Sequence, residues 1–89
     1  MPYFARIFEF DPTDTRVADV RPAHRAYVDE LFESGNIAMS GPWETMDGAL
    51  IIYDVADEAA ARAAIAADPY TDAGVVTELS LRAWKVTTG

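Results

Sequence analysis

Hydrophobic side chains occupy both parities of the segment Tyr3–Phe10, with phenylalanines on one side and Ala5 and Ile7 on the other. Aromatic and β-branched residues favour strands, and a strand that is apolar on both sides is usually covered on both faces. The pattern therefore predicts a buried first strand.

A helical period follows the turn-forming segment 11–15. Asp19 can cap a helix that has Pro22 in its first turn, runs to Ser34 and stops at Gly35. The positions predicted to face inward share the helical spacing: Val20, His24, Tyr27, Val28, Leu31 and Phe32. The inner face of this helix thus carries a histidine, one turn from the helix start.

A hairpin is predicted next. Ile37–Ser40 has the length of a short strand and is broken by Gly41-Pro42, while Asp47-Gly48 signals the turn that opens Ala49–Val55. The longer of these two strands is again apolar on both sides.

The second helix is alanine-rich and ends near Asp68. Asp57 can cap Glu58–Ala67, and Pro69 biases the preceding residue out of the α region. A carboxylate at the negative end of a helix dipole is unfavourable by roughly 0.3–1 kcal/mol. We therefore expect either a plain Asp-Pro turn or a cationic or proton-donating partner for Asp68. The last strand is predicted over Val75–Val86.

The element order is strand, helix, strand, strand, helix, strand, within one domain of residues 1–89. The usual solution is an α+β fold of the ferredoxin-like βαββαβ type, a four-stranded antiparallel sheet with two helices on one face. Since two strands are apolar on both sides and the helices shield one face, we predict a homodimer through the open face of the sheet.

Composition narrows the classes of partner and cofactor. The 15 acidic against 7 basic residues give a net charge of −8, which disfavours nucleic acid and anionic membranes. With no cysteine and one histidine, disulfides, thiolate sites and most histidine metal sites are excluded. Neither a glycine-rich phosphate loop nor a metal-ligand motif occurs, so no cofactor or metal is expected. Without a signal-peptide pattern or a long apolar run, we expect a cytoplasmic protein.

The predicted topology brings three segments to one end of the domain. The start of the first helix, with His24, meets the end of the second, with Asp68, and the Ser40-Gly41-Pro42 corner lies at the same end. A carboxylate bonded to one ring nitrogen fixes a histidine tautomer and stabilises its cation, as in a general base. Ser40 and the Gly41 N–H could orient a substrate oxygen. The ordinary alternatives are a structural His24, a helix-ending Asp68 and a strand-breaking Gly-Pro pair.

Charged residues near these segments also have two interpretations. Arg6 could bind an anion, although a pair with Glu78 on the last strand is the commoner arrangement. Arg21 and Arg25 flank the histidine and could hold an anionic substrate, or could pair with a neighbour such as Asp29 on the helix surface. The aromatic residues that could line a pocket, but are more usual in a core or interface, are Tyr27, Trp43, Tyr70 and Trp84.

Several motifs occur together in one order: Arg21-Pro22-Ala23-His24, Ser40-Gly41-Pro42, Ala67-Asp68-Pro69-Tyr70, Ala73-Gly74-Val75 and Trp84-Lys85. In this combination the sequence resembles the YCII-related family, represented by the bacterial YciI proteins. The resemblance implies a dimeric α/β barrel and an active site centred on a His and an Asp, which match His24 and Asp68. It also implies small-molecule chemistry, and dehydrochlorination of a chlorinated hydroxyquinone is known in the family.

Three functions are compatible with these observations. The first is a cofactor-independent enzyme in which His24, oriented by Asp68, moves a proton in an elimination, isomerisation or hydration of a small, for example aromatic, substrate. Here Ser40, Gly41, Pro42 and Tyr70 would bind the substrate. The second is a non-catalytic small-molecule-binding or accessory dimeric module. The third is a structural dimerisation unit, whose pocket would be filled by its own side chains.

Overall fold

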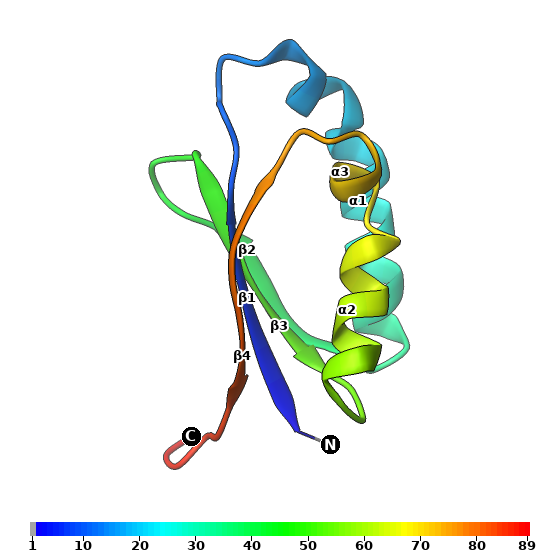
Figure 1. Cartoon of the computed structure of the whole chain (residues 1–89), viewed down its shortest axis with the longest axis vertical. Coiled ribbons are helices and arrows are strands. Elements are labelled where there is room, and N and C mark those ends of the chain that lie inside the picture. Colours follow the sequence, from blue (N-terminus) through cyan, green and yellow to red (C-terminus); the bar gives the residue numbers. More distant parts are fainter. Residues whose placement is uncertain (1) are drawn as a thin grey trace.

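One antiparallel sheet with helices on one side makes up the computed structural model, which describes residues 2–89. The elements are β1 (Tyr3–Glu9), α1 (Thr15–Glu33), β2 (Ile37–Pro42), β3 (Gly48–Asp54), α2 (Glu58–Ala66), α3 (Pro69–Asp72) and β4 (Thr77–Trp84). The strand order is β2-β3-β1-β4, with every neighbouring pair antiparallel. The helices α1 and α2 run in opposite directions over the same face (Figure 1). The predicted α+β architecture is confirmed, with α3 as an additional short helix.

The side of the sheet that faces the helices carries the core. Phe4 and Phe8 of β1 are buried there, opposite Tyr53 and Ala49 of β3. Arg6 lies between the two phenylalanines on the same side and has no exposed surface. Because side chains alternate along a strand, Phe4, Arg6 and Phe8 point to the same face of β1. One charged group therefore lies in an otherwise hydrophobic layer.

The helices leave the second face of the sheet uncovered (Figure 1). The strand register places these hydrophobic residues on it: Ala5, Ile7, Met39, Leu50, Ile52 and Trp84. Met39 is 61% exposed and Trp84 is 47% exposed. Coverage of β1 and β3 on both faces therefore stays a prediction, since it requires a second chain.

The first helix begins five residues earlier than the sequence pattern predicts, with Asp14 in place of Asp19 before its first residue. Asp14 caps it and accepts a hydrogen bond from the Arg16 N–H at 3.0 Å. The prediction of Asp19 as the cap is wrong, because the helix has already begun at Thr15 and Asp14 caps its first turn. Pro22 consequently lies inside the helix, where it removes one backbone hydrogen bond. Phe32, predicted to face inward, is 55% exposed and lies in the last turn of α1.

The hairpin strand β2 continues through the glycine-proline pair that was expected to end it. Pro42 lies opposite Ala49 of β3, and β2 forms an edge of the sheet. A proline is tolerated on an edge strand because its missing N–H need not donate to a neighbouring strand. The prediction of a break at Gly41 is therefore wrong. The last strand is shorter than predicted, Thr77–Trp84 in place of residues 75–86.

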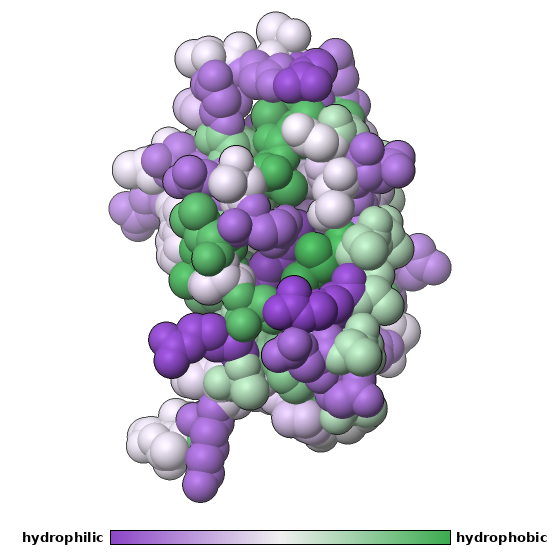
Figure 2. Space-filling view, viewed as in Figure 1, coloured by the Kyte–Doolittle hydropathy of each residue, from purple (hydrophilic) through white to green (hydrophobic). Residues whose placement is uncertain are grey.

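The second helix, α2, is rich in alanine, whose small side chain lets the helix backbone pack close to the core. Asp57 caps α2 as predicted, accepting from the Ala60 N–H at 2.8 Å, and Ala61 is fully buried. The exposed alanines give the weakly hydrophobic surface seen over the position of α2 in Figure 2. No helix within residues 2–89 is long and apolar enough to cross a membrane.

Candidate active site

Asp68 starts a helix rather than ending one. The second helix stops at Ala66, and Asp68 is the N-cap of α3, where its Oδ1 accepts from the Tyr70 N–H at 2.9 Å. Pro69 is the first helical residue, a position where a missing N–H costs nothing. The predicted unfavourable dipole position is therefore wrong, because a new helix start holds the carboxylate.

Two side chains meet the buried carboxylate of Asp68. His24 Nδ1 lies 2.7 Å from Oδ1, and Arg6 Nη1 donates to Oδ2 at 2.8 Å. Asp68 has no exposed surface, so these contacts, with the Tyr70 N–H, replace the hydration that the charge has lost. The pair expected from the topology, His24 with Asp68, is in contact, and Arg6 is an additional partner.

Arg6 forms ion pairs with two carboxylates, those of Asp68 and Glu78. Its Nε and Nη2 donate to the two oxygens of Glu78 at 2.8 and 2.6 Å, and Nη1 also donates to the Tyr53 hydroxyl at 3.1 Å. The guanidinium lies over the Phe8 ring, 4.2 Å from its centroid. The predicted pairing of Arg6 with Glu78 is present. Its contact with Asp68 was missed, although the shared parity with Phe4 and Phe8 is the signal that Arg6 points into the core.

The charges of this cluster follow from its hydrogen bonds. Burial acts to raise the pKa of Asp68, but the bonds from His24 and Arg6 outweigh it and hold that pKa below the ordinary value of 3.8. Burial acts to lower the pKa of Arg6, yet the bonds to Glu78 and Asp68 leave it raised. Burial also raises the pKa of Tyr53 to about 12. At neutral pH Asp68 is therefore a carboxylate, Arg6 a guanidinium and Tyr53 a neutral phenol.

An ionised Asp68 determines the tautomer of a neutral His24. A carboxylate has no proton to donate, so the 2.7 Å bond requires the imidazole hydrogen on Nδ1. The lone pair then lies on Nε2, on the other side of the ring. Packing fixes the ring plane, since His24 stacks on Tyr70 with centroids 3.9 Å apart and an interplanar angle of 13°. The imidazole is thus held in one orientation with one tautomer.

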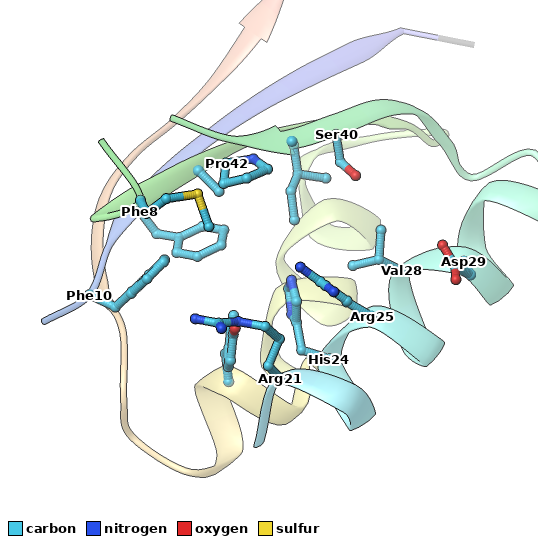
Figure 3. A pocket seen from close by; sticks show the side chains of 14 residues that line it. Phe8, Phe10, Arg21, His24, Arg25, Val28, Asp29, Ser40 and Pro42 are labelled. Atoms are coloured by element: carbon cyan, nitrogen blue, oxygen red, sulfur yellow. The ribbon is translucent and has the colours of Figure 1, made fainter. Parts of the chain in front are cut away.

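A cavity of about 240 Å³ opens beside His24. Figure 3 shows the imidazole at its wall, with Phe8 and Phe10 across from it and Ser40 and Pro42 on β2. Cavities of about 150 Å³ hold benzene, so this one has the size for a substituted single ring. An unfilled cavity at this place counts against the third, purely structural, candidate function.

The comparisons with known proteins place the chain in a family. The model of the YCII-related domain matches residues 2–85. The chain belongs to the YCII-related family. Its fold is similar to that of 5-chloro-2-hydroxyhydroquinone dehydrochlorinase from Burkholderia phenoliruptrix AC1100, solved in complex with 2,5-dihydroxybenzoquinone. The TM-score is 0.74 at 20% identity, over 100% of this chain and 96% of that one. A comparison with curated proteins found no similar sequence.

Within this YCII-related domain the other predicted site residues divide into two groups. Ser40, Gly41, Pro42 and Tyr70 all line the cavity. Tyr27 does not, because its hydroxyl donates to the Ala64 carbonyl at 2.7 Å and links α1 to α2. Trp43 and Trp84 also lie outside it. Trp84 instead approaches Tyr3 at the edge of the open sheet face, with ring centroids 6.3 Å apart.

Several residues that line the cavity were not predicted as site residues, among them Phe8, Phe10 and Met46. Phe10 was predicted as the last residue of the first strand and instead follows β1, and Met46 belongs to the loop between β2 and β3. Met46 has a φ of 59°, a conformation that no hydrophobic period signals. Within the described residues no cluster of three or more His, Cys, Asp or Glu side chains could hold a metal ion.

The lowered pKa of Asp68 predicts acid sensitivity of the fold. Above the ordinary carboxyl pKa of 3.8 its contribution to stability is complete, and it is lost as the pH falls below that value, where the unfolded chain binds the proton first. We expect the free energy of unfolding to fall less steeply in Asp68→Asn than in the wild type. Urea unfolding between neutral pH and about pH 2.5, at one protein concentration, measures both slopes. Equal slopes would contradict the assignment.

Proposed function

We propose that this YCII-related protein is an enzyme in which His24 acts as general base and then general acid on a small aromatic substrate. The observation that carries the proposal is the chain of contacts from Arg6 through Asp68 to His24, ending at the wall of a ring-sized cavity. A histidine with a fixed tautomer whose ring lines a cavity is the arrangement that proton transfer requires.

The proposed chemistry begins with His24 Nε2 taking a proton from a C–H or O–H of the substrate. The electron pair left behind either forms a double bond while a leaving group departs with its own pair, or accepts a proton at another atom. The first outcome is an elimination and the second an isomerisation. Asp68 then faces an imidazolium, and because Arg6 is shared between Asp68 and Glu78, the cluster has one negative charge in excess to stabilise that cation.

The aromatic substrate is supported by the cavity walls and by the structural relative. Rings of Phe8, Phe10 and Tyr70 line the cavity and offer faces and edges to a bound ring. The relative of the same fold is named as a dehydrochlorinase, an enzyme that removes hydrogen chloride, of 5-chloro-2-hydroxyhydroquinone. Ser40 and the backbone of Gly41 stand at the cavity, where they would orient a substrate oxygen.

The test is turnover by the wild-type protein. Chlorinated and unchlorinated single-ring hydroquinones and hydroxyquinones are incubated with it under nitrogen, and chloride release and product masses are followed. We expect at least one compound to be converted without an added cofactor. Saturable binding with every bound compound recovered unchanged would instead favour the non-catalytic binding module.

We further propose that two chains pair through the open sheet face, which keeps the cavity side free. The exposed Met39 and Trp84 both lie on that face. The wild type is expected to have twice the 9.7 kDa mass of the chain by light scattering. The combined variant Met39→Glu and Trp84→Glu should be monomeric, because carboxylates would be buried at the interface. Phe32→Glu, equally exposed but on α1, should leave the dimer intact. An unchanged mass in the double variant would contradict this interface.

A further inference from the structure

Two arginines stand beside the histidine on the cavity wall. Arg21 and Arg25 both line the cavity, and Figure 3 shows their side chains extending from α1 toward it beside His24. Arg21 lies three and four residues before His24 and Arg25, a spacing that puts Cβ atoms about 5–6 Å apart on a helix, and all three residues line the cavity. The cavity therefore has two guanidinium groups next to the proposed base.

Neither of these guanidinium groups is neutralised by the protein. Among residues 2–89, Arg6, Arg16 and Arg62 form ion pairs, whereas Arg21 and Arg25 form neither an ion pair nor a side-chain hydrogen bond. The helix-surface pair with Asp29 that sequence spacing allows is not formed. Within the described residues, both guanidinium groups therefore have N–H donors that no protein side chain uses. These donors are free to bind an anionic ligand in the cavity.

The chain as a whole is acidic, whereas the cavity wall beside His24 carries two arginines. There are 15 acidic and 7 basic residues in the sequence, yet two of the seven line this cavity, and Asp29 is the one acidic residue within the described part of the chain that does. Asp68, the other nearby carboxylate, lies behind the histidine and is already bonded to Arg6. The local surplus is positive, and a partly enclosed wall strengthens its attraction for an anion relative to open water.

We propose that Arg21 and Arg25 form a carboxylate-binding subsite, so that the substrate is a single-ring aromatic acid. This inference rests on the proposed function, since it takes the cavity as the substrate site. The planar guanidinium fork matches the two oxygens of a carboxylate, and the ring would lie against Phe8 and Tyr70. A hydroxyl or C–H on the same ring would then reach His24. The volume of about 240 Å³ suits one ring with small substituents.

The experiment compares two probes of the same shape and different charge, 3-hydroxybenzoate and neutral 3-hydroxybenzamide. The single histidine of the chain gives one set of imidazole NMR signals, and their displacement reports binding at the cavity directly. We expect the benzoate to bind the wild type about tenfold or more tightly than the amide, as charge-assisted hydrogen bonds provide. The preference should shrink as salt is added.

Matched variants assign the preference to the two arginines. The double variant Arg21→Gln and Arg25→Gln should bind both probes alike, while Asp29→Asn should strengthen binding of the benzoate alone. Arg82→Gln is the control, because Arg82 lies opposite Ala5 on the open sheet face, and it should keep the wild-type preference. Equal binding of the probes to the wild type, no saturable displacement with either probe, or a preference that survives the double variant would overturn the proposal.

The subsite and the proposed acid-base chemistry can fail separately. His24→Gln should keep the preference for the anionic probe, followed by calorimetry since the reporting ring is gone, while losing turnover. If the preference is found but no aromatic acid or hydroquinone is converted, the subsite stands and the catalytic function fails. If turnover is found and the double variant loses none of it, the subsite fails and the catalytic function stands.

Discussion

Replacing His24 by glutamine is expected to lower kcat by at least about 10²-fold, the effect typical of losing a general base. The glutamine amide can still donate a hydrogen bond to Asp68 Oδ1, which His24 contacts at 2.7 Å, so the buried carboxylate keeps a partner. What disappears is the nitrogen that takes the proton. The measurement is turnover of the compound that the screen identifies, with unfolding in urea as the check that the variant is folded.

Tyr27→Phe is the matched control for this variant. Tyr27 lies on the same helix, one turn further along, and its hydroxyl donates to the Ala64 carbonyl rather than to the cavity. It should lose stability but keep a kcat near that of the wild type. Turnover retained in His24→Gln, or lost equally in Tyr27→Phe, would contradict the role of His24 as the base.

How far the sequence predicts this molecule can be judged from its elements. The apolar runs of β1 and β3 and the turn residues and stops between the elements predicted the βαββαβ order, because hydrophobic runs and turn residues depend on a few neighbours. Element boundaries were less secure. Asp14 and Asp19 can both cap a helix, and the continuation of β2 through Pro42 depends on that strand lying at a sheet edge, which is a property of the whole sheet.

The same distinction holds for the site. Antiparallel helices predicted that His24 and Asp68 share one end of the domain, and the structure places them in hydrogen-bonding contact. The contact of Arg6 with Asp68 could not be predicted, since it joins residues 62 positions apart and depends on side-chain rotamers. Nor could α3, whose start changes Asp68 from a helix end to an N-cap. The topology therefore predicted that His24 and Asp68 lie close together. The additional bond from Arg6 and the capping role of Asp68 depend on local geometry that the sequence pattern does not contain.

Replacing Arg6 by methionine is expected to lower the free energy of unfolding by about 3–5 kcal/mol, the loss typical when one partner of a buried ion pair is removed. Arg6 is fully buried and serves Asp68, Glu78 and Tyr53 at once. Arg62→Met is the control, because the Arg62–Glu58 pair is exposed and should contribute no more than about 1 kcal/mol. Urea unfolding at one protein concentration measures both, and similar losses would contradict the prediction.

A second substitution separates what Arg6 does for stability from what it does for His24. In Arg6→Met combined with Asp68→Asn the uncompensated buried charge is gone, so part of the lost stability should return. Turnover should not return, because a neutral amide no longer stabilises the imidazolium that His24 becomes. Recovery of turnover in the double variant would mean that the carboxylate is structural. If Arg6 keeps the Asp68 carboxylate ionised so that it can stabilise the imidazolium of His24, the double variant should recover stability but not turnover.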